Sequence, residues 1–408
     1  MMKSKFTSIL NYKPSRERVW YLTGICIAVV LTILENFLSP GPDANLYFGL
    51  GNNLLNGVGY IDNIRNDYIL PPIGHPLLIS LFSLIGLSGL LFNKIIFFAA
   101  IFFSFRVFRL AETSLLTSII LVFLIPVVLP SFIIYGVEVS LFLSSVLVVL
   151  TLLMYVSNYT LLNGILLGLS LFGFLIIRPL LLPALILCAL IAVMLILFRK
   201  KMFRLLAPVL GIPIIALVIT SAVSYSNYGD SRYTQGTYSA ITLFCSFNEY
   251  IDLKATYYSD RWNEIPVSKR EEGIRLLSIP DNGKWKDRDQ ILKREVTNFI
   301  IEHPKDAIEA FLWRLKKFSF GADGIIFRIV FYCWLLISIF SVFRIFSRPM
   351  SVKSKTLILF SLLLPAYIIG VQAIFVYCGS RYYVVPALFM IFGTVIMCKN
   401  TFLNKSKG

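Results

Sequence analysis

Eleven apolar runs, most of them about as long as a membrane-crossing helix, make up about half of this 408-residue chain. They cover residues 19–38, 76–91, 92–110, 115–130, 137–155, 161–177, 180–197, 205–224, 325–343, 356–376 and 383–397. With 57% hydrophobic and only 15% charged residues, the chain cannot form the charged surface of a soluble globular protein. We therefore expect an all-α polytopic membrane protein. The first run follows a basic segment but lacks a small-x-small cleavage site, so we expect a retained anchor.

The net charge of +16 is explained by where the basic residues lie. Residues 225–322 hold 15 basic and 14 acidic residues, and the rest of the chain holds 23 basic and 8 acidic ones. This excess flanks the apolar runs, which is typical of the positive-inside bias and predicts no nucleic-acid partner. If all eleven runs crossed, Arg106, Arg109 and the basic cluster at 199–204 would face outside. We therefore predict that 76–91 is a half-helix dipping in from the outside, which leaves ten spans.

The predicted topology divides the chain into three regions. Residues 1–224 form a transmembrane domain with a first outer loop at 39–91, which we interpret as the active-site loop. Residues 225–322 form an extracytoplasmic, mainly helical region, and 323–408 form the carboxyl-terminal transmembrane helices. Within the extracytoplasmic region we expect helices near 267–277 and 284–302. A third helix from Pro304 is amphipathic, with Ile308, Phe311, Leu312 and Leu315 on one face, and is predicted to lie on the membrane.

The segment 39–76 is the one polar island in the first half of the chain, and it carries Asp43, Asp62 and Asp67. Charges beside a bilayer are costly, which makes them functional candidates. Asp43 precedes a short helical pattern with Leu46, Leu50 and Leu54 four residues apart, Tyr47 one turn after the carboxylate, and Gly57 as its stop. The alternative reading of Asp43 is a helix N-cap.

The topology places nine polar residues, the three aspartates included, at the same outer boundary, and several of them have a structural alternative. They are Asp43, Asp62, Asp67, His75, Lys94, Glu138, Arg178, Arg328 and Arg381. Glu138 at the start of a span could serve only the helix dipole, and Arg178 or Arg381 could be interfacial anchors. His75 has no second His or Cys at ligand spacing, so we predict no zinc site. With no phosphate-binding loop, serine-hydrolase or zinc-protease motif, carboxylates would do the chemistry and arginines would hold an anion.

Several of these stretches resemble a known family. The outer loop PDANLYFGLGNNLLNG, followed by PPIGHPLL, is similar to the first outer loop of GT-C glycosyltransferases of the protein-mannosyltransferase-like and aminoarabinose-transferase-like group. Further matches in order are YGVEVSLFLSSVLVVL, GILLGLSLFGFLIIRPLLLP, NFIIEHPKDAIEAFLWRLKKF and RYYVVPALFMIFG. The resemblance implies a GT-C-like fold with about ten spans and juxtamembrane helices. It also implies an integral protein of the bacterial inner membrane whose active site faces the periplasm or outside.

The resemblance further implies an inverting transfer of a sugar from a polyprenyl phosphate to a glycan, lipid or protein acceptor. Asp43 would be the general base and Glu138 its helper, and Lys94, Arg178 and Arg381 would bind the lipid phosphate. Further substrate contacts would come from Tyr47, Asp62, Asp67, His75 and Tyr382. The family's second acid after the loop aspartate is Ala44 here, so we expect no resident metal, and Asp43 would hold a Mg²⁺ or Mn²⁺ ion if one is used.

Two other classes of function fit the same residues. A transporter or flippase of a lipid-linked sugar would bind the donor without reacting, but transporters tend to carry charges near the midplane and inverted repeats. A non-catalytic envelope assembly protein would work through its outer region, and Asp43 would be replaceable.

Overall fold

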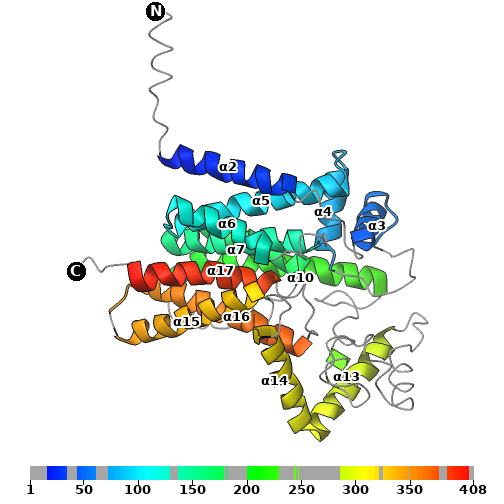
Figure 1. Cartoon of the computed structure of the whole chain (residues 1–408). Coiled ribbons are helices and arrows are strands. Elements are labelled where there is room, and N and C mark those ends of the chain that lie inside the picture. Colours follow the sequence, from blue (N-terminus) through cyan, green and yellow to red (C-terminus); the bar gives the residue numbers. More distant parts are fainter. Residues whose placement is uncertain are drawn as a thin grey trace, which may run out of the picture.

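Helices make up every regular element in the part of the chain that the structure describes (Figure 1). This computed structural model describes residues 16–34, 44–60, 72–128, 137–178, 181, 200–228, 243–244, 247, 285–320, 325–347, 349–375 and 384–403. The helices are α2 (Arg16–Leu34), α3 (Ala44–Leu55), α4 (Gly74–Ser83), α5 (Gly89–Leu110), α6 (Leu115–Val128), α7 (Val137–Ser157), α8 (Leu161–Ile177), α10 (Lys200–Tyr228), α13 (Trp285–Glu302), α14 (Pro304–Phe320), α15 (Ile325–Ser347), α16 (Val352–Phe375), α17 (Val384–Cys398) and the π-helix η5 (Lys399–Leu403).

Seven of these helices, namely α2, α5, α7, α10, α15, α16 and α17, contain stretches long and apolar enough to cross a membrane. The prediction of an all-α polytopic membrane protein is thereby confirmed. The predicted spans at 115–130 and 161–177 form the shorter apolar helices α6 and α8. The predicted span at 180–197 lies outside the described residues, apart from Leu181.

The run at 76–91 does not form a span. Helix α4 has only 10 residues, which extend about 15 Å, half the thickness of the hydrocarbon core. It ends at Ser83, and α5 begins after Ser88, whose side chain accepts a hydrogen bond from the Leu91 amide. The prediction that this run is a short helix, separate from the span that follows it, is therefore confirmed. The side from which it enters a membrane stays a prediction.

Ion pairs show which helix ends lie together. Glu17, in the first turn of α2, pairs with Arg109 at 2.8 Å and with Arg106 at 3.8 Å, both near the end of α5. Lys399, just after α17, pairs at 2.9 Å with Glu112, just after α5. We call this end of the bundle the basic end. Helices α3 and α4 lie at the opposite end (Figure 1), which we call the α3–α4 end. The predicted topology requires the same arrangement, with the start of α2 and the ends of α5 and α17 on one side of the membrane and α3 and α4 on the other.

Helix α7 lies at the centre of the bundle. It packs against α5, α8 and α17, and 78% of its apolar stretch is buried, compared with 22% for α10. Aromatic contacts such as Phe97–Phe142 and Phe174–Phe389 join these helices. Residues on α7 therefore lie inside the protein, whereas α2, α10 and α15 present most of their surface to the surroundings.

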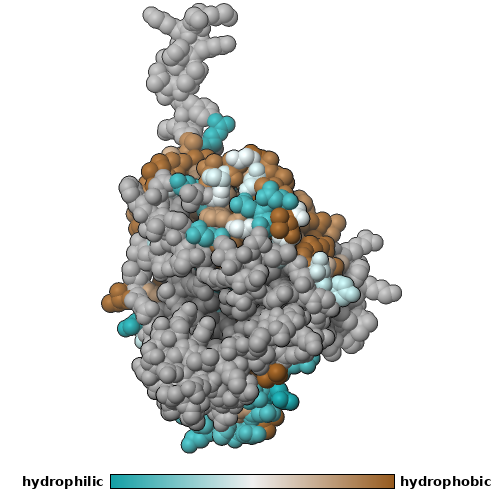
Figure 2. All heavy atoms as spheres, turned by 90° about the vertical axis from the view of Figure 1, so that its right-hand side faces the viewer, coloured by the Kyte–Doolittle hydropathy of each residue, from teal (hydrophilic) through white to brown (hydrophobic). Residues whose placement is uncertain are grey.

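Two helices of the predicted extracytoplasmic region form as expected. α13 covers the predicted 284–302 and α14 starts at Pro304, whereas the predicted helix at 267–277 lies outside the described residues. Leu292, Val296 and Phe299 of α13 form a small separate core with Phe244 and Phe247. In Figure 2, the lower edge, where α13 and α14 lie, is mainly hydrophilic, and the helices at the upper edge are mainly hydrophobic.

The predicted apolar face of α14 packs partly against the protein core and is partly exposed. Phe311 and Leu315 pack against the main core, whereas Ile308 and Leu312 are exposed. Only the second pair is free to contact a membrane surface, because the first pair is already occupied by the protein. The prediction that all four share one membrane-facing side is wrong in this respect.

We predict that the two ends face opposite sides of the membrane. In a variant without the six native cysteines, a membrane-impermeant maleimide applied to intact cells should label Val58→Cys, which lies exposed just after α3. It should label Ser351→Cys, exposed before α16, only after the membrane is permeabilised. Labelling of Ser351→Cys in intact cells would contradict the predicted orientation.

Candidate functional site

The candidate site begins where α4 meets the end of α8. Gly74 is the first residue of α4, and a β-carbon added there would lie 2.5 Å from the carbonyl oxygen of Ile176 and 2.8 Å from the amide nitrogen of Ile177. Only glycine permits this approach of two backbones. Pro76 fits the first turn of α4 because no backbone amide partner is required there. The contact fixes the position of the next residue, His75.

His75 is completely buried where four helices meet. Its Nδ1 lies 2.8 Å from Oγ of Ser140 on α7. Its ring centroid lies 5.2 Å from that of Tyr47 on α3, edge to face, and 5.7 Å from that of Phe92 on α5. The structure thus brings two predicted substrate-binding residues, Tyr47 and His75, into contact. Ser140 and Phe92 are additional members that the sequence interpretation missed.

The protonation state of His75 follows from its burial. Loss of solvation lowers the pKa of His75 to about 3, so the ring is neutral at pH 7 and one of its nitrogens carries a proton. Its Nε2 is buried and has no hydrogen-bond partner among the described residues. An unsatisfied buried polar atom costs about 1–3 kcal/mol. Nε2 is therefore available to a hydroxyl group of a ligand.

Glu138 lies in the first turn of α7 with only 2% of its surface exposed. α5 and α7 both begin at the α3–α4 end, and Phe97 of α5 lies beside Phe142 of α7, with ring centroids 6.2 Å apart. Asn93 and Glu138 each precede these rings by one helical turn, so they lie at the same level. Oδ1 of Asn93 is also buried and has no hydrogen-bond partner among the described residues.

This degree of burial goes beyond what a helix-dipole role requires. An exposed carboxylate in the first turn already stabilises a helix by about 0.3–1 kcal/mol, whereas taking an ionised carboxylate out of water costs several kcal/mol. The helix-dipole interpretation therefore does not by itself account for this burial, and the role of Glu138 as a functional acid stays a prediction.

The two predicted phosphate-binding residues that the structure describes differ in placement. Arg178 ends α8 in an extended conformation, with its amide donating to the Phe174 carbonyl at 2.8 Å, and its side chain is half-buried. It follows directly on the residues that contact Gly74, so it lies beside the start of α4. Lys94 is half-buried two residues after Phe92 on α5, hence on the opposite side of that helix from His75. The structure does not gather Lys94 with His75.

Five predicted site residues, Asp43, Asp62, Asp67, Arg381 and Tyr382, lie outside the described residues. Asp43 directly precedes Ala44, where α3 begins. Helix α3 forms as predicted, with Leu50 buried. It ends at Leu55, and Gly57, two residues later, has the φ of +72° typical of a helix stop, with the Val58 amide donating to the Asn53 carbonyl at 2.9 Å. Arg328, on α15, is exposed.

A buried arginine on α14 is a further finding that the sequence interpretation missed. Arg314 is 2% exposed, its Nε donates to the Ala373 carbonyl on α16 at 2.7 Å, and its guanidinium lies 4.5 Å from the ring centroid of Phe247. Beside it, the side-chain amide of Gln372 is fully buried with no hydrogen-bond partner among the described residues. The signal was that Arg314 falls between Phe311 and Leu315, on the face of α14 that packs inward.

The fold defines a polytopic α-helical membrane protein in which buried polar and ionisable residues gather at the α3–α4 end. Among the described residues, no three His, Cys, Asp or Glu side chains lie together as metal ligands would. No protein-family model matches the chain, and searches of curated proteins and of solved structures gave no significant match.

We predict that His75 makes the folded protein sensitive to acid. Its pKa is lower in the folded state than its ordinary value of 6.5, so the unfolded state binds a proton first as the pH falls. Stability is then lost below pH 6.5. Lowering the pH from 7 to 5 should reduce the free energy of unfolding by about 2 kcal/mol through this residue. Thermal unfolding of the wild type and of His75→Gln in detergent measures the difference, and equal pH dependence in the two proteins would contradict it.

Proposed function

We propose that this protein is a membrane glycosyltransferase that moves a sugar from a polyprenyl-phosphate donor to an acceptor on the extracytoplasmic face. The resemblance of its sequence motifs to GT-C enzymes supports the proposal. The observation that carries it is the buried carboxylate of Glu138 at the α3–α4 end, where α3 begins directly after Asp43 and Arg178 follows the last residue of α8. In this proposal, the α3–α4 end faces the outside of the bacterial inner membrane.

The proposed reaction needs a base and an anion site but no high-energy cofactor. The acceptor hydroxyl attacks the anomeric carbon, its proton passes to the carboxylate of Asp43, and the bond from that carbon to the phosphate oxygen breaks. Polyprenyl phosphate leaves with the bonding electrons, and the displacement inverts the anomeric centre. Glu138 orients the acceptor or Asp43. A positioned base contributes about 10²–10⁴-fold to the rate, and cationic groups stabilise the charge on the departing phosphate.

Arg178 is the described residue best placed to bind that phosphate. Its guanidinium suits bidentate contact with phosphate oxygens, and its helix ends beside His75 and the start of α4. Arg381 shares this role. Lys94 is a weaker candidate for phosphate binding than either arginine, because it lies on the opposite side of α5 from His75. Tyr47 and the neutral His75 suit sugar hydroxyls, and Asp62, Asp67 and Tyr382 remain candidates for the same contacts.

We predict that Asp43→Asn separates catalysis from a structural cap. Asparagine caps a helix as well as aspartate does, so the variant should fold and bind the donor, yet it should lose at least about a hundredfold in transfer rate. Glu138→Gln should be milder. The assay incubates purified protein with radiolabelled polyprenyl-phosphate sugars and measures release of polyprenyl phosphate.

Two other results of this assay would change the proposal. Near-normal transfer by Asp43→Asn would reject it as the base and shift the role to Asp62 or Asp67. Donor binding without release of polyprenyl phosphate from any sugar would favour a transporter or flippase.

We further predict that Arg178→Ala raises the donor KM roughly ten- to a hundredfold, because a charge-assisted hydrogen bond contributes about 1.5–3 kcal/mol. Arg178→Lys should recover only part of this loss. Arg328→Ala, which removes an exposed arginine from α15, is the matched control and should leave KM unchanged. Equal KM values for Arg178→Ala and the control would make Arg178 an interfacial anchor only.

A further inference from the structure

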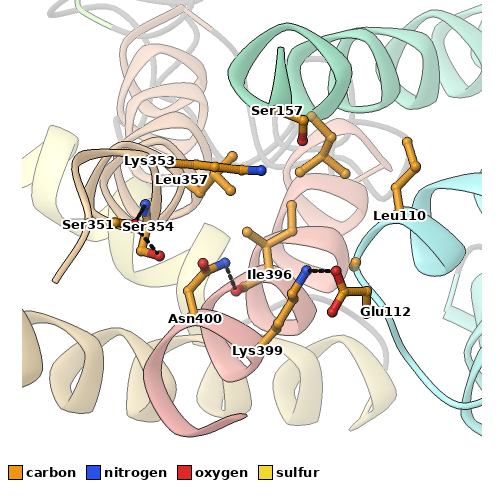
Figure 3. Close-up of a pocket in the computed structure, with 12 residues that line it drawn as sticks. Leu110, Glu112, Ser157, Ser351, Lys353, Ser354, Leu357, Ile396, Lys399 and Asn400 are labelled. Carbon is orange, nitrogen blue, oxygen red and sulfur yellow. Dashed lines mark hydrogen bonds and ion pairs between the residues drawn. The ribbon is translucent and has the colours of Figure 1, made fainter. Parts of the chain in front are cut away.

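A cavity lies at the basic end of the bundle, far along the helices from the candidate site. It has a volume of about 230 Å³ and is lined by the ends of α5, α7 and α17 and the start of α16 (Figure 3). Its walls are apolar where Leu110, Leu153, Leu357 and Ile396 contribute and polar elsewhere. The polar part contains Lys353, Lys399 and the hydroxyls of Ser157 and Ser354.

The lysines give this cavity a positive charge that the protein neutralises only in part. Figure 3 shows the amino group of Lys353 directed into the cavity, between Ser157 and Ile396. Lys353 forms no ion pair within the described ranges. A lysine near a membrane surface ordinarily extends its ammonium group into water. Lys353 is exposed, so its ammonium group keeps contact with water while it also supplies, together with Lys399, positive charge at a cavity where an anion could lie.

The start of α16 adds to the positive potential. The side chain of Ser351 accepts a hydrogen bond from the Ser354 amide at 3.1 Å, which is an N-cap. The amino terminus of this 24-residue helix carries the positive end of the helix dipole. Amides and a dipole at such a position favour phosphate groups.

The second lysine is held by an unusual residue. Glu112 follows α5 with a φ of +58°, the only non-glycine residue with positive φ in the described part of the chain. Its amide donates to the Arg109 carbonyl and the Thr113 amide to the Phe108 carbonyl, so it occupies the position at which glycine usually ends a helix. Its carboxylate lies 2.9 Å from Nζ of Lys399. Glu112 thus keeps Lys399 at the cavity and competes with any anion for it.

We propose that this cavity binds a phosphate-bearing anion at the membrane surface, with Lys353 as its main cationic contact and Lys399 as a second one. The ligand's phosphate lies among Lys353, Lys399 and Ser354, and any glycerol or acyl portion lies along the leucines. Two sources share this chemistry, namely the headgroup of an anionic phospholipid and free phosphate. The amphipathic lining suits the headgroup. The site is independent of the proposed transferase activity, because it lies at the other end of the bundle.

The experiment titrates the purified protein in a neutral detergent with one of three probes and follows thermal stabilisation. The probes are dioctanoyl phosphatidylglycerol, dioctanoyl phosphatidylcholine and inorganic phosphate. Phosphatidylglycerol should stabilise the wild type, and Lys353→Ala should weaken its apparent Kd by about tenfold. Lys353→Arg should retain binding. Glu112→Gln should strengthen binding roughly fivefold by releasing Lys399. If Lys353 and Glu112 had only a structural role, Lys353→Ala and Glu112→Gln would not change the affinity in opposite directions.

Lys355→Ala is the matched control, because Lys355 lies on the same helix but does not line the cavity. It should behave as the wild type. Stabilisation by inorganic phosphate that depends on Lys353 would also support the site and identify free phosphate as its source. Equal effects of phosphatidylglycerol and phosphatidylcholine, or equal losses in Lys353→Ala and Lys355→Ala, would overturn the proposal.

Discussion

The contact between Gly74 and the backbone of α8 sets the geometry of the α3–α4 end. Because a side chain at position 74 would meet the Ile176 carbonyl oxygen, α4 can lie against α8 only with glycine there. This contact carries His75 into the junction of α3, α5 and α7, where it meets Tyr47, Phe92 and Ser140. It also places the start of α4 beside Arg178. Helix α4 is too short to cross a membrane. It instead joins four other helices, namely α3, α5, α7 and α8.

Charged side chains are arranged differently at the two ends of the bundle. At the α3–α4 end, the side chains of Glu138 and Arg314 are both buried, and burying an ionisable group carries a desolvation cost. At the basic end, most cationic groups are paired or stacked, as Arg109 is with Glu17 and over Trp20. Lys353, directed into the cavity at this end, forms no ion pair with a described residue. The proposed transfer chemistry and the proposed phosphate site thus fall at opposite ends of the bundle.

The sequence predicted those features that depend on local pattern. The membrane class, α3 with its stop at Gly57, the separation of α4 from α5, and the bounds of α13 and α14 follow from hydropathy, glycine and proline. Pairings between distant segments could not be read in this way: the His75–Ser140 contact, the inward face of Arg314 and the turn of Lys94 away from His75 depend on how helices pack. Asp43, Asp62, Asp67, Arg381 and Tyr382 lie outside the described residues, so their roles remain sequence-based proposals.

We propose that the α3–α4 end holds the phosphate of a lipid-linked donor. Electron cryomicroscopy of the purified protein with polyprenyl phosphate, the proposed leaving group, tests it directly. We expect phosphate density within hydrogen-bonding distance of the Arg178 guanidinium, about 2.7–2.9 Å from its nitrogens to the oxygens, at the end of the bundle that carries His75 and Glu138. Density for the phosphate midway along α7, or at the basic end alone, would contradict it.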